Sequence, residues 1–141
     1  MSVLKSQFPK FFLLLLLAVG MVSCHKDCKS LYGEGGNVNL ALPQFYPLNT
    51  VGGFMTINRG YRGIYIYRNT LTDFVACECA CPGGHDATLE PVADYGGLVL
   101  RCPVCGSQFS VLDGMPLEGS ETSCPVYLYN THLDGDILMI W

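Results

Sequence analysis

The chain after residue 36 contains several short apolar segments, and in the first of them the larger apolar side chains fall on every second residue, as in a half-buried β-strand. The first such segment contains Val38, Leu40 and Leu42. Further short apolar segments, bounded by glycine, proline or aspartate, lie at 54–57, 64–67, 73–76, 98–100, 108–112, 126–129 and 137–140. No segment beyond the N-terminal leader shows a helical period. Short strands separated by turn residues predict a small all-β antiparallel sandwich or barrel.

Two Asp-Gly dipeptides mark tight turns between these segments. Asp113-Gly114 follows the segment 108–112, and Asp134-Gly135 joins the two closing strands, 126–129 and 137–140.

The first 23 residues have a different character. Lys5 and Lys10 precede an apolar run at 11–19. This run is shorter than the roughly 20 residues that a membrane span needs. A run of this length after positive charge is typical of a secretory signal peptide. Ser23-Cys24 then resembles the cleavage site of a bacterial lipoprotein, so we expect residues 1–23 to be removed and Cys24 to carry lipid. The alternative is an uncleaved N-terminal anchor.

Either interpretation predicts an exported, membrane-anchored protein of the bacterial cell envelope, facing the periplasm or the cell surface. Residues 24–36 are polar and contain glycine, which predicts a tether, and residues 37–141 then form one domain. The formal net charge is −4, and both leader lysines contribute to it. An acidic domain argues against nucleic acid as a partner and offers no basic membrane-binding patch.

The chain has eight cysteines, so setting Cys24 aside for lipid leaves an odd number. They cannot all pair within one chain, and in an oxidising compartment disulfides compete with metal binding. Cys124 is a candidate to pair with Cys77 or Cys28.

Two cysteine-rich loops carry the candidate chemistry. The range 102–109 reads Cys-Pro-Val-Cys-Gly-Ser-Gln-Phe, which places the sulfurs of Cys102 and Cys105 on one side of a tight turn. The range 77–85 reads Cys-Glu-Cys-Ala-Cys-Pro-Gly-Gly-His. If this loop is extended, Cys79 and Cys81 point to one face and approach one site.

These loops resemble the two cluster-binding loops of Rieske iron–sulfur proteins, Cys-x-His-x-Gly and Cys-Pro-x-His-Gly-Ser-x-Phe. Cysteine stands at both histidine positions of that pattern, as Cys81 and Cys105. The resemblance covers roughly residues 37 to 141 and implies a Rieske-like fold with the two loops together at one end.

By this resemblance, Cys79 and Cys102 match the ligands of the inner iron, and Cys81 and Cys105 those of the outer iron. His85 is the alternative ligand, since the glycine turn before it could carry it back to the site.

Three states of the site follow. The first is a 2Fe–2S cluster with four thiolates, whose potential would fall toward that of ferredoxins. The second is a structural zinc ion, and the third is a metal-free state with disulfides. The first predicts an electron-transfer protein with a redox partner protein, and not an enzyme on its own. The others predict a non-redox binding or structural domain of the envelope.

The sequence gives less support to a third function, that of a thiol–disulfide enzyme. A thiol–disulfide enzyme using Cys102 and Cys105 would need a low thiol pKa, yet this Cys-x-x-Cys does not open a predicted helix.

Overall fold

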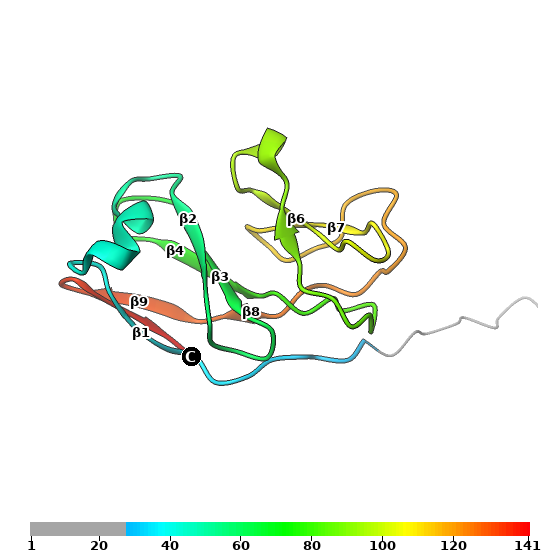
Figure 1. Ribbon diagram of the computed structural model, residues 1–141, viewed down its shortest axis with the longest axis horizontal. Helices are drawn as coiled ribbons and strands as arrows, with labels where there is room; N and C mark the ends of the chain where they lie inside the picture. The colour runs from blue at the N-terminus through cyan, green and yellow to red at the C-terminus, as the bar shows by residue number, and fades with distance from the viewer. Residues whose placement is uncertain (1–27) are drawn as a thin grey trace, which may run out of the picture.

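The computed structural model describes residues 28–141, whose regular elements are mainly short β-strands (Figure 1). The predicted signal peptide and Cys24 lie outside these residues. The strands are β1 (Gly36–Asn39), β2 (Phe54–Ile57), β3 (Ile64–Arg68), β4 (Phe74–Glu78), β5 (Glu90–Pro91), β6 (Val99–Arg101), β7 (Gln108–Ser110), β8 (Leu128–Tyr129), β9 (Thr131–Asp134) and β10 (Ile137–Ile140). Two 3-10 helices, η1 (Pro43–Asn49) and η2 (Ala93–Tyr95), complete the elements. Among the described residues, no helix has the length and apolarity to cross a membrane.

The strands form three antiparallel sheets with the orders β1-β10-β9, β2-β3-β4-β8 and β5-β6-β7. Figure 1 shows β2, β3 and β4 lying over β1 and β9 in one half of the molecule, with β6 and β7 in the other half. The prediction of a small all-β fold with antiparallel strands is therefore confirmed.

Strand β3 lies between two buried clusters because consecutive residues of a strand point to opposite faces. Ile64 and Ile66 pack with Val38 and Leu138 in one cluster, which joins the first sheet to the second. Tyr65 points the other way, into the cluster that joins the second sheet to β6 and β7. This second cluster also contains the two cysteine loops.

The predicted segment 54–57 coincides with β2, and the Asp134-Gly135 turn joins two paired strands as expected. The strand before that turn is β9, however, and the predicted segment 126–129 is reduced to β8. Sequence reasoning also missed η1, whose two prolines and three-residue repeat give no α-helical period.

The N-terminal residues 28–35 form no regular element, yet they contact the domain. The Tyr32 ring stacks on Tyr127 with centroids 4.5 Å apart, and the Gly33 N–H donates to the Tyr129 hydroxyl at 3.1 Å. Cys28 forms a disulfide with Cys124, so the structure contains one of the two pairings that the sequence left open. Part of the range predicted as a tether is thus attached to the domain.

A buried carboxylate fixes the loop between β2 and β3. Glu78 is fully buried, and its Oε1 accepts a hydrogen bond from the Arg62 N–H at 2.8 Å. Its Oε2 accepts from the Tyr61 N–H at 2.8 Å and from the Tyr129 hydroxyl at 2.6 Å. These donors offset the cost of removing a carboxylate from water. The loop is therefore held against the end of β4, where the first cysteine loop begins.

We predict that Glu78→Gln lowers the free energy of unfolding by about 1–3 kcal/mol, because an amide NH₂ would then face a backbone N–H or hydroxyl donor. Urea unfolding followed by circular dichroism measures the change. Glu90→Gln, at an exposed position of β5, is the matched control and should have little effect. Equal stabilities of the two variants would contradict a structural role for the Glu78 carboxylate.

Candidate metal centre

The first cysteine loop leaves β4 and folds back on itself. The Cys79 N–H donates to the Gly63 carbonyl at 2.9 Å, and the Leu89 N–H donates to the Cys79 carbonyl at 2.7 Å. Between them the chain reverses, with Gly84 at a φ of 83°, which favours glycine. This turn brings His85 Nδ1 to 3.7 Å from the Cys81 sulfur. The return of His85 toward the site, which the glycines suggested, is present in the structure.

The second cysteine loop connects β6 to β7. The Gly106 N–H donates to the Cys102 carbonyl at 2.9 Å, and the Cys102 N–H donates to the Ser107 carbonyl at 2.9 Å. Gly106 has a φ of 72°, so it closes the turn without strain. Cys102 and Cys105 are thereby presented from one compact loop.

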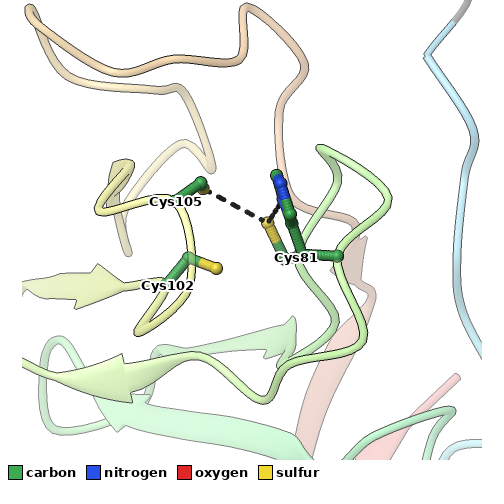
Figure 2. A group of neighbouring side chains, drawn as sticks. Cys81, Cys102 and Cys105 are labelled. Carbon is green, nitrogen blue, oxygen red and sulfur yellow. Dashed lines mark hydrogen bonds between the residues drawn. The ribbon is translucent and has the colours of Figure 1, made fainter.

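The two loops bring together Cys81, His85, Cys102 and Cys105 (Figure 2). Their potential ligand atoms all lie within 4.8 Å of one another, and the sulfurs of Cys81 and Cys105 are 3.8 Å apart. Cys81 and Cys102 are fully buried, whereas His85 and Cys105 are partly exposed. Each loop therefore supplies one buried thiol and one donor at the edge of the site.

Cys79 is not part of this group. Its side chain is fully buried in the cluster between the sheets, with Cys77, Leu100 and Phe109. The structure thus gathers three of the four predicted sulfurs with the alternative ligand His85, which the turn at Gly84 returns toward Cys81.

The thiols of the group differ in acidity. Burial is the main cause that raises the pKa of Cys81, and the neighbouring Cys102 and Cys105 raise it further. Burial also acts on Cys105, but hydrogen bonds from the Ser107 hydroxyl and backbone N–H outweigh it and lower the pKa of this thiol. As the pH rises, Cys105 therefore loses its proton before Cys81, and the first negative charge forms at the exposed edge of the site. A bound cation would stabilise the remaining thiolates and release their protons.

Sequence reasoning missed the segment that supports the second loop. Ser107 is fully buried, and its Oγ accepts hydrogen bonds from the backbone N–H groups of Glu121 and Thr122 at 2.9 and 3.4 Å. The serine of the loop motif was visible in the sequence, but no signal connected it with residues 120–124.

No protein-family model matches the chain, and no curated protein matches it. Among solved structures, it is similar to the ferredoxin of carbazole 1,9a-dioxygenase from Nocardioides aromaticivorans IC177. The identity is 19%, the match covers 64% of this chain and 86% of that chain, and the TM-score is 0.47.

The chain is also similar to a complex of reduced oxygenase and oxidized ferredoxin in carbazole 1,9a-dioxygenase. Here the identity is 20%, the coverage 79% of this chain and 94% of that chain, and the TM-score 0.48. For Sphingomonas yanoikuyae B1 ferredoxin the values are 14%, 81%, 97% and 0.40. These similarities are distant, and the chemistry of the site follows from its own residues.

We predict that the metal-free domain loses stability as the pH rises above 9. Burial, followed by the charge of Glu78, raises the pKa of Cys79 from 9.0 to about 12. Below pH 9 both folded and unfolded chains keep this proton, so its contribution is constant. Between these values only the unfolded chain releases it, which lowers the free energy of unfolding by up to about 1.4 kcal/mol per pH unit.

Cys79→Ala removes this titration and should make the decline with pH shallower. Urea unfolding of both proteins at intervals across this range measures the two slopes. Equal slopes would show that the Cys79 thiol does not titrate abnormally in the folded chain.

Proposed function

We propose that Cys81, His85, Cys102 and Cys105 hold a 2Fe–2S cluster and that the domain transfers electrons. The division of the donors between the loops is the observation that carries the proposal. Each loop gives one buried thiol and one donor at the edge of the site. In the Rieske pattern each loop likewise supplies one ligand to each iron. Cys81 and Cys102 would then bind the inner iron, and His85 and Cys105 the outer iron.

This assignment moves the ligands of the first loop along the chain relative to the sequence alignment. Cys81 takes the place proposed for Cys79, and His85 takes the place proposed for Cys81. The first loop then offers one cysteine and one histidine, as the Rieske pattern does, while the second loop keeps cysteine at Cys105.

Three thiolates and one imidazole fit an iron–sulfur cluster, since soft thiolate donors select such clusters. A bound cluster would supply one-electron chemistry. Because one thiolate replaces one of the two Rieske imidazoles, its potential should lie between those of Rieske centres and four-cysteine ferredoxins. The buried thiols of Cys81 and Cys102 exclude water, and His85 and Cys105 give a partner protein access to the outer edge.

A single zinc ion is the second candidate, favoured by the compactness of the group. In a tetrahedral site with Zn–S bonds of about 2.3 Å, two sulfurs lie about 3.8 Å apart. The sulfurs of Cys81 and Cys105 have a separation of 3.8 Å. A cluster distributes its ligands over two irons. With zinc, the domain would be a non-redox structural or binding module.

We also propose export and lipid anchoring to the bacterial cell envelope. The Cys28–Cys124 disulfide supports export, because such bonds persist mainly in oxidising compartments. The apolar run and Ser23-Cys24 support a lipoprotein signal. Two or more acyl chains would then give stable anchoring.

The cluster proposal is tested on protein purified without oxygen. Iron, zinc and acid-labile sulfide are measured, together with visible absorption and the electron-spin signal of the reduced protein. We expect iron and sulfide in a two-to-two ratio with both spectra present. Zinc without these spectra would favour the structural site, and protein without any metal would contradict both candidates.

Individual variants test the ligand assignment. We predict that Cys81→Ser, Cys102→Ser, Cys105→Ser and His85→Ala each lose most of the bound metal, since each removes a direct ligand. Cys79→Ser is the matched control, a fully buried cysteine of the first loop outside the group, and should keep its metal. Retention in His85→Ala with loss in Cys79→Ser would restore the four-sulfur site instead.

For the anchor, we predict that Cys24→Ala abolishes labelling by a radioactive fatty acid and blocks normal processing. Cys28→Ser, four residues further on, is the control and should be labelled like the parent chain. Unchanged labelling of Cys24→Ala would remove the lipoprotein interpretation.

A further inference from the structure

The segment 117–127 forms no regular strand, yet it covers the second cysteine loop. The Leu117 N–H donates to the Gln108 carbonyl at 2.8 Å. The Ser120 hydroxyl accepts from the Gln108 N–H and donates to the Gln108 carbonyl, both at 3.0 Å. The segment therefore satisfies the backbone groups of Gln108, three residues after the candidate ligand Cys105.

The contact continues one residue closer to the site. Ser107 Oγ accepts from the backbone N–H groups of Glu121 and Thr122. Ser107 also closes the turn that carries Cys105, because its carbonyl accepts the Cys102 N–H at 2.9 Å. Its hydroxyl and backbone N–H lower the pKa of the Cys105 thiol. A chain of contacts thus runs from the segment through Ser107 to a candidate ligand.

The other end of this chain of contacts is covalent. Thr122 accepts the Cys124 N–H on its Oγ1 at 3.1 Å, and Cys124 is bonded to Cys28. A few residues after Cys28, Tyr32 stacks on Tyr127, which follows Cys124 by three residues. The disulfide and this ring pair close a small loop.

Without the disulfide, residues 120–124 would be held by a few hydrogen bonds to the second cysteine loop and by the burial of Thr122 and Cys124. With the disulfide, their detachment must also displace residues 28–31. Tyr32 and Gly33 keep their own contacts with Tyr127 and Tyr129, so β1 would remain in place if the disulfide were absent. The mechanical effect of the bond is therefore local to the segment and the loop beneath it.

We propose that the Cys28–Cys124 disulfide acts as a positioning staple for the metal centre, holding residues 120–124 on Ser107 and thereby fixing Cys105 toward Cys81. The metal-binding part rests on the proposed function, and the attachment of the segment does not. Ser107 and the disulfide are positioning elements, since neither is a proposed ligand.

Cys28→Ser in the full chain tests the staple, because Cys28 is exposed and serine replaces its sulfur with little change in volume. Amide hydrogen exchange of the metal-free protein is followed at Glu121, Thr122 and Gln108. We expect exchange there to accelerate about tenfold or more, with a smaller change at Ile66 in β3. The variant Cys28→Ser/Cys124→Ser, which leaves no free thiol at this place, should behave in the same way.

The matched control is Ile66→Val, which weakens the opposite cluster and leaves the segment unchanged. It should accelerate exchange through global unfolding, without selective loss of protection at Glu121 and Thr122. If exchange in Cys28→Ser rises equally at these residues and at Ile66, the staple is refuted, whether or not the protein binds metal.

The rate of metal release tests whether the disulfide also positions Cys105, in addition to holding residues 120–124. Loaded protein is challenged with excess chelator, and we expect Cys28→Ser to release its metal several times faster than Ile66→Val. Equal release rates, despite selective exchange at Glu121, would overturn the effect on Cys105. If the parent chain never binds metal, the proposed function fails, and the exchange result alone decides whether the staple exists.

Discussion

The packing of β3 and β4 against β6 and β7 determines where the two cysteine loops meet. Tyr65 lies in this contact, fully buried, and its hydroxyl donates to the Gly97 carbonyl at 2.8 Å. Leu100 and Phe109 face it from the smaller sheet. Both loops begin at strands that form this contact, so the separation of their thiols follows from how the sheets pack.

Cysteines take two distinct roles within this contact. Cys77 and Cys79 lie on the same face of the chain and are fully buried, where they act as small apolar residues. Burial raises the pKa of both thiols, which keeps them protonated and unreactive. Cys81 and Cys102 are also fully buried, but they lie where the two loops meet, and Cys105 is partly exposed. The fold thus separates packing cysteines from candidate ligands.

The sequence allowed much of the fold to be predicted, because short apolar segments and glycine-containing turns are local signals. β2 and the turn at Asp134-Gly135 are examples. β5 consists of two residues whose pairing with β6 depends on the tertiary fold, so no local pattern indicated it.

The sequence predicted the residue types that form the candidate site, but not every residue that belongs to it. A period of two predicted that Cys79 and Cys81 point to one face, and both lie in the same buried cluster. Only Cys81 is grouped with Cys102 and Cys105, and the turn at Gly84 adds His85 to them. The pairing of Cys28 with Cys124 was one of two open choices, since an odd number of cysteines indicates only that some remain unpaired.

The separation of Cys28 and Cys124 by 96 residues has a consequence for biogenesis. The chain is made from its N-terminus, so Cys28 emerges early and meets Cys77, Cys79 and Cys81 before its own partner exists. An early oxidation of Cys28 would therefore join the wrong sulfurs and would have to be reversed by thiol exchange. Burial of Cys77, Cys79 and Cys81 in the folded sheets removes these competitors and favours the native bond.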